Sequence, residues 1–187
     1  NMKNDFDDWI AVAHTFTYSN ALQKALTRVD DPLIVRGVFH GAVAVYMDRF
    51  FNVPAARLPQ APLNGEAVRL DNFDRDFLEV LDRRQSVAEA ATIVHRFLKG
   101  GGDDRLLWRT LAKALLQEDA EFHTYQVFEA GYQQYRGWDV QDPAFARVDR
   151  GLIPIAVARY LASHAPTMRQ SAYIADVARR LQRGEAL

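Results

Sequence analysis

The sequence contains no cysteine. This absence excludes disulfide bridges, zinc sites with thiolate ligands, iron–sulfur clusters held by cysteine and catalysis by a cysteine nucleophile. It is also typical of a protein from a reducing compartment. The acidic N-terminal stretch lacks the basic start and the apolar run of a signal peptide, so we expect a cytoplasmic location.

An excess of charge of one sign and long apolar runs are missing as well. The formal net charge is -1, so no overall field attracts nucleic acid or an acidic membrane surface. The longest nearly uncharged stretch, residues 33–47, is too short to span a bilayer. We therefore expect no nucleic-acid partner and no membrane association, and we interpret this stretch as a buried core helix.

Strand-like alternation is scarce, whereas the three- and four-residue spacing of helices is widespread. The first five expected helices span about residues 5–29, 32–51, 73–84, 86–99 and 103–136. We expect a further helix to begin at Asp142, and Gly151 and Pro154 should kink it or divide it in two. The last expected helix spans about residues 167–183. Seven or eight helices predict an all-α, single-domain multi-helix bundle over residues 1–187.

Two helix starts have the spacing of a capping box, in which a hydroxyl and a glutamate or glutamine side chain bind each other's backbone amides. They are Ser86 with Glu89, and Thr167 with Gln170. We expect a helix to begin just after each hydroxyl residue.

Histidine provides the most specific functional signal. The five histidines each lie within an expected helix: His14, His40, His95, His123 and His164. The helix that contains His40 is apolar on nearly all sides, which predicts a central position in the bundle. We therefore expect the His40 imidazole to be buried and to need hydrogen-bond partners.

Helical bundles build metal sites from inward side chains on facing helices, and neutral imidazole is the commonest transition-metal ligand. Within one continuous helix, the four-residue spacing of Asp119 and His123 would direct both towards one ion, and Glu118 adds a carboxylate. The sequence therefore predicts an iron or zinc site at His14, His40, His123, Asp119 and Glu118. Without a metal, His40 and His14 would be catalytic acid–base groups near neutral pH.

The opposing interpretation is that each histidine is a packing or helix-end residue with its own hydrogen bond. The chain has neither the Glu-x-x-His pair of di-iron bundles nor the His-Glu-x-x-His of zinc proteases. The apolar segment that follows Phe50 has three interpretations: coverage of the bundle end, which we favour, a lid, or a docking site.

Two functions from different classes therefore stay open, and the chain is not assigned as an enzyme. The first is a helical protein with a histidine-lined internal site that binds a metal or an apolar small molecule, with redox chemistry as one use. The second is a non-catalytic interaction module or homo-oligomer, in which the segment 50–63 or the aromatic residues between Phe122 and Tyr135 meet a partner.

Two segments resemble the questin-oxidase-like group of bacterial helical, histidine-rich proteins. One is residues 14–22, in which His14 precedes a threonine, and the other is residues 36–46, which run from an arginine to a tyrosine around His40. The resemblance implies an oxidoreductase that acts on a polycyclic aromatic substrate. It covers a small part of the chain and assigns no catalytic residue.

Overall fold

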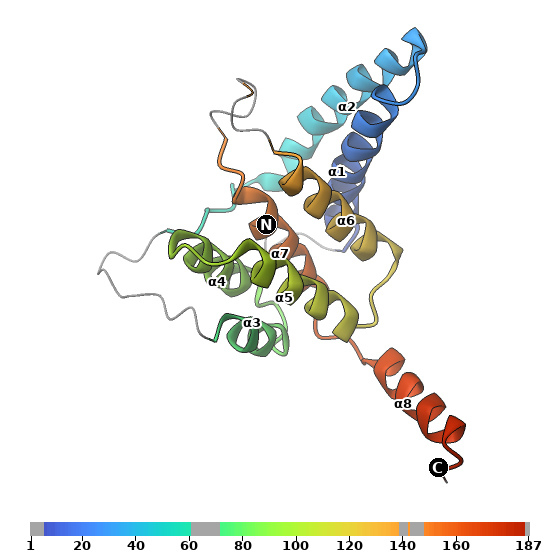
Figure 1. Ribbon diagram of the computed structural model, residues 1–187. Helices are drawn as coiled ribbons and strands as arrows, with labels where there is room; N and C mark the ends of the chain where they lie inside the picture. Colours follow the sequence, from blue (N-terminus) through green and yellow to red (C-terminus); the bar gives the residue numbers. More distant parts are fainter. Residues whose placement is uncertain (1–5, 61–71, 139–141, 143–147, 186–187) are drawn as a thin grey trace.

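The computed structural model describes residues 6–60, 72–138, 142 and 148–185 (Figure 1). This part of the chain contains α-helices and short 3-10 helices and no β-strand, which confirms the all-α multi-helix fold. The elements are α1 (Phe6–Leu26), η1 (Pro32–Ile34), α2 (Val35–Asp48), η2 (Arg49–Asn52), α3 (Phe73–Leu81), α4 (Val87–Lys99), α5 (Asp104–Gln117), α6 (Phe122–Arg136), α7 (Leu152–His164) and α8 (Gln170–Gln182).

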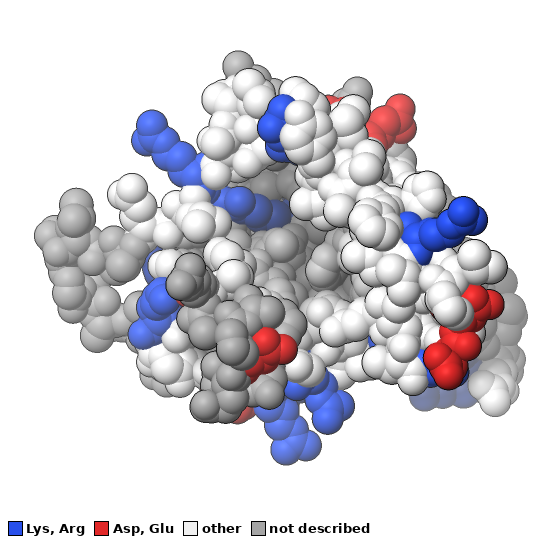
Figure 2. All heavy atoms as spheres, turned by 90° about the horizontal axis from the view of Figure 1, so that it is seen from above, with Lys and Arg blue, Asp and Glu red and all other residues white. Residues whose placement is uncertain are grey.

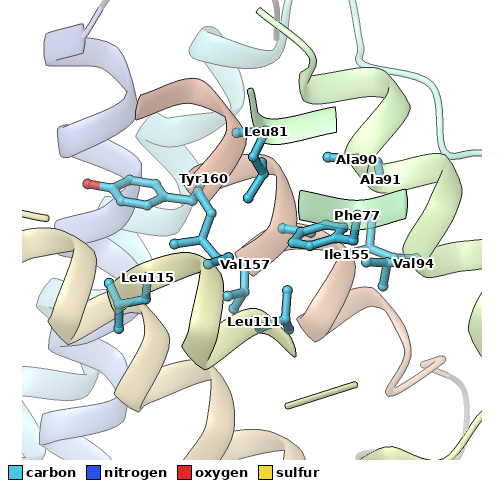
Figure 3. Packing of buried hydrophobic residues seen from close by; sticks show 14 of the residues in the cluster. Phe77, Leu81, Ala90, Ala91, Val94, Leu111, Leu115, Ile155, Val157 and Tyr160 are labelled. Atoms are coloured by element: carbon cyan, nitrogen blue, oxygen red, sulfur yellow. The ribbon is translucent and has the colours of Figure 1, made fainter. Parts of the chain in front are cut away.

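The apolar core lies between α3, α4, α5 and α7 (Figure 3). Phe77, Val94 and Leu111 are fully shielded from solvent, and Val157 of α7 is 1% exposed. Burying an apolar side chain of this size contributes about 1.5–3 kcal/mol to the free energy of unfolding. These four helices therefore form the stable body to which the other helices attach.

The helix α6 packs closely against α7 at a glycine. A Cβ atom added to Gly131 would lie 2.5 Å from Cγ2 of Val157, which is shorter than the distances at which Cβ atoms contact other atoms in proteins. The absence of a side chain at this position therefore lets the two helices approach. On its other side α6 contacts α1, where Gln134 donates hydrogen bonds to Asn20 and Gln23 at 2.9 and 2.6 Å.

The position of α2 differs from the expectation of a central, buried helix. Only Gly41 of α2 is buried, and the helix projects beside α1 away from the body (Figure 1). Tyr18 of α1 lies over the glycines of α2, and its hydroxyl donates to the Gly37 carbonyl at 3.0 Å. The small residues of α2 therefore face α1, and its large apolar side chains are left on the outside.

The single helix expected over residues 103–136 is in fact two helices, α5 and α6. At the break, Glu118 has an extended backbone with ψ 161°, and the N–H of Asp119 donates to the Thr167 hydroxyl at 2.9 Å. A tertiary hydrogen bond therefore replaces the helical one, which the spacing of apolar residues along the chain does not reveal.

The helix starts differ from the two expected capping boxes, although another side chain caps α5. Asp103 caps α5 by accepting from the N–H of Leu106 at 2.9 Å. The Ser86–Glu89 box does not form, because the backbone of Ser86 is not extended as a capping residue requires, and Glu89 pairs with Arg83 at 2.7 Å.

The other capping box is also absent. The helix α8 begins at Gln170, and its first N–H groups are bound by Asp119 rather than by Thr167. The helix expected to open at Asp142 and Pro143 would begin largely in residues 143–147, which lie outside the described part, and α7 begins after Gly151 with Pro154 in its first turn. No helix among the described residues is long and apolar enough to cross a membrane.

Candidate functional site

Two of the predicted site histidines meet. His14 of α1 and His123 of α6 have their ring centroids 4.7 Å apart, with the ring planes inclined at 71°. His14 is exposed and His123 is half-buried, and Nδ1 of His123 is shielded without a hydrogen-bond partner among the described residues. The packing of α1 on α6 brings this pair together.

His40 is exposed, contrary to the expectation that it is buried. The reason is the position of α2, which contacts α1 through its glycines and is not enclosed by the bundle. Within the described ranges, His40 has no hydrogen bond or ring contact that links it with His14 or His123. It therefore does not complete the expected three-histidine set.

The two predicted carboxylate ligands bind the backbone between α7 and α8. Glu118 accepts hydrogen bonds from the N–H and the hydroxyl of Thr167 at 2.6 and 2.7 Å. Asp119 accepts from the N–H groups of Gln170 and Ser171, both at 2.8 Å. Because these bonds stabilise its ionised form, they lower the pKa of the Asp119 carboxyl.

No three histidine, aspartate or glutamate side chains in the described ranges are grouped so that they could hold a metal ion. The helix break at residues 118–121 is one reason, since Asp119 and His123 no longer share a helix face. His164 instead contacts the Tyr160 carbonyl through Nδ1 at 2.9 Å and lines a small cavity of about 260 Å³ beside Glu118.

A larger open cavity lies elsewhere, between α1, η2 and α7, and we call it the groove. Its volume is about 670 Å³. The face of the molecule in Figure 2 is hollowed near its centre and is mostly uncharged around the hollow. The apolar side chains that line the groove include Trp9, Val12 and Phe16 of α1, Phe51 of η2, Leu58, and Ile153 of α7.

The walls of the groove follow from helical spacing. Trp9, Val12 and Phe16 are three and four residues apart, so they share one face of α1. On α7, Tyr160 points away from the body of the core (Figure 3), and its ring meets the edge of Trp9 with the centroids 6.4 Å apart. This aromatic contact joins the two main walls.

The charged side chains that line the groove include Asp48 and Arg159, and both have shifted pKa values. Burial raises the pKa of the Asp48 carboxyl, and a hydrogen bond with Thr15 opposes this shift. Burial lowers the pKa of the Arg159 guanidinium, which donates to the Arg57 carbonyl at 2.7 Å. The groove therefore offers a large apolar area with a few polar groups, which is the usual composition of a small-molecule site.

The histidine-based prediction missed the groove, since none of its lining residues is a histidine. One sequence signal could have indicated it: Arg159 interrupts the apolar run from Leu152 to Ala162. Such a residue is either exposed at a helix surface or placed where its charge is used. The segment after Phe50 contributes Phe51 and Leu58 to the wall, so it lines a cavity rather than only covering the bundle.

Comparison with protein-family models, with curated proteins and with solved structures gives no match for this chain.

Proposed function

We propose that the protein binds an apolar small molecule in the groove between α1, η2 and α7. The observation that carries this proposal is the predominantly apolar lining of a cavity of about 670 Å³. Ligand sites of soluble proteins have volumes of about 300–1,000 Å³ and bury most of the ligand against apolar and aromatic side chains. The groove fits this description without any contribution from a metal ion.

Other parts of the sequence-based hypothesis stay predictions. They are acid–base catalysis at His40 and His14, redox chemistry, a cytoplasmic location, and metal binding at the set His14, His40, His123, Asp119 and Glu118. The resemblance to the questin-oxidase-like group also stays a prediction, and it names polycyclic aromatic compounds as one class of apolar molecule to be tested in the groove.

Fluorescence of a neutral apolar probe, N-phenyl-1-naphthylamine, tests the proposal. Ala156 lies on α7 at the groove and is exposed, so Ala156→Trp places a large ring in the groove without disturbing the core. Ala88 is an exposed alanine on α4, outside the groove, and Ala88→Trp is the matched control.

We expect the probe to fluoresce strongly with the wild type and with Ala88→Trp, and to lose most of this signal with Ala156→Trp. A probe signal that Ala156→Trp leaves unchanged would overturn the proposal, as would the absence of probe binding by the wild type. Circular dichroism of all three proteins shows whether the fold is retained.

A second candidate function rests on α2: we propose that it mediates self-association. Phe39 is 70% exposed and Val43 is 61% exposed, although apolar side chains of this size are usually buried. Residues 38–47 contain no Asp, Glu, Lys or Arg, so the same face of two copies can meet without repulsion between like charges. A twofold contact between two α2 helices would cover both faces at once.

Sedimentation equilibrium tests this second function. We expect the wild type to form a dimer, and Phe39→Glu to shift it to the monomer because a charge then lies on the apolar face. Met168, which is 82% exposed near α8, provides the control variant Met168→Glu. A monomeric wild type, or a dimer that Phe39→Glu leaves intact, would exclude α2 as the interface.

A further inference from the structure

Arg159 is the one strongly basic side chain of α7, and it lines the groove in a half-buried position. Its guanidinium donates to one acceptor, the Arg57 carbonyl, at 2.7 Å. None of the ion pairs in the described part of the chain includes Arg159. It is therefore a partly desolvated cation whose charge is balanced by no carboxylate among the described residues.

Such an arrangement is costly for a protein without a ligand. A charged group that is removed from water loses favourable hydration free energy, and a hydrogen bond to one carbonyl oxygen compensates only part of this loss. A guanidinium has five N–H donors in a planar fork, and the contact with Arg57 occupies only part of this capacity. The geometry of the remaining donors matches the two oxygens of a carboxylate.

The acidic residues of the groove do not supply that carboxylate. Asp48 and Asp8 both line the groove, and neither lies within ion-pair distance of Arg159. The hydrogen bond of Asp48 is with Thr15 of α1. The apolar side chains around Arg159 lower the local dielectric constant, which strengthens any charge-assisted hydrogen bond formed there.

We infer that the ligand of the groove is an amphipathic acid, with an apolar body held by the walls and a carboxylate held by Arg159. This inference rests on the proposed binding function and specifies the head group of the ligand. The same chemistry is found in aliphatic acids and in aromatic acids, and the test below includes both.

The test compares pairs of probes that differ only in the head group. Dodecanoate is compared with dodecanol, and naphthoate with naphthylmethanol, each as a competitor of N-phenyl-1-naphthylamine at neutral pH. We expect the acid of at least one pair to bind about tenfold more tightly than its alcohol, because only the acid forms charge-assisted hydrogen bonds with Arg159. The pair that shows the preference identifies the aliphatic or the aromatic class.

Variants then assign the preference to Arg159. We expect Arg159→Gln to bind acid and alcohol equally, with the affinity for the alcohol close to that of the wild type. Arg96, an exposed arginine on α4 outside the groove, gives the control Arg96→Gln, which should keep the full preference. Thermal unfolding shows whether Arg159→Gln is folded, and the comparison of acid with alcohol on the wild type tests the inference even if it is not.

Two outcomes would overturn the inference: equal binding of acid and alcohol by the wild type, or a preference for the acid that persists in Arg159→Gln. Both are distinct from failure of the proposed function, in which neither head group displaces the neutral probe or Ala156→Trp leaves binding unchanged.

Discussion

Glu118 and Arg169 form an ion pair that joins the end of α5 to the start of α8. Nε and Nη2 of Arg169 donate to Oε1 of Glu118 at 2.9 and 2.6 Å, and Asp82 accepts a further bond from the same guanidinium. Arg169 has a left-handed backbone with φ 53°, which costs a non-glycine residue about 1–3 kcal/mol. The ion pair therefore offsets a strained conformation at a junction that holds the start of α8.

The first prediction concerns Glu118, whose side chain is 10% exposed. Glu118→Gln removes the charge and turns an amide N–H group towards Arg169 or Thr167. We expect the free energy of unfolding to fall by about 1–3 kcal/mol, the range for a lost charge-assisted hydrogen bond. Urea unfolding measures the change. Glu79→Gln, at an exposed pair with Arg75, is the control and should change the free energy of unfolding only slightly. An effect of Glu118→Gln as small as that of the control would contradict the prediction.

The second prediction is a pH dependence. The pKa of Asp119 is lowered below its ordinary value of 3.8 by hydrogen bonds from Ser171 and Gln170. A lowered folded-state pKa means that the stabilisation is fully present above pH 3.8 and is lost as the pH falls through the folded pKa. The difference in unfolding free energy between the wild type and Asp119→Asn should therefore shrink below pH 3.8. A difference that stays constant with pH would show that this carboxylate does not cap α8.

The third prediction compares two buried glycines. A Cβ atom on Gly131 would overlap Val157, whereas a Cβ atom on Gly41 would make ordinary contact with Tyr18 at 3.5 Å. We expect Gly131→Ala to lower the free energy of unfolding by about 1–3 kcal/mol through overpacking. Gly41→Ala should raise it by about 0.5–1 kcal/mol, because alanine favours the helix. Thermal or urea unfolding shows whether each substitution raises or lowers the free energy of unfolding. If both substitutions change it in the same direction, this account of the packing is wrong.

The fourth prediction concerns His40, which the sequence placed in a buried site. Because His40 is exposed, His40→Ala should change the free energy of unfolding by less than about 0.5 kcal/mol. The binding of N-phenyl-1-naphthylamine should also be unchanged, since His40 does not line the groove. A large loss of stability or of probe binding would instead support the buried position expected from the sequence.

Much of the helical content could be predicted because it depends on local signals. Proline and glycine mark the ends of the helices, and Asp103 caps α5 as its type suggests. The division between α5 and α6 could not be predicted, because the hydroxyl that binds the Asp119 amide belongs to Thr167, 48 residues further along the chain. Local spacing contains no information about such a partner.

The candidate site was harder to predict than the fold. An apolar helix is usually central, yet α2 turns its glycines towards α1 and its large side chains outward. His40 is therefore exposed, although the pattern around it favours burial. The groove depends on how faces of α1 and α7 meet, so only its basic residue, Arg159, is visible in the sequence as an interruption of an apolar run.

The position of α2 has a consequence for local unfolding. Because α2 packs on α1 and buries only Gly41, its backbone hydrogen bonds can open while the body of α3, α4, α5 and α7 stays closed. Its amide hydrogens should therefore exchange with solvent before those of α4 and α5, and trypsin should cut early at Arg36. If two copies associate through α2, hydrogen exchange and tryptic cleavage in α2 both slow as the protein concentration rises. Hydrogen exchange in α4 and α5 should not depend on the protein concentration.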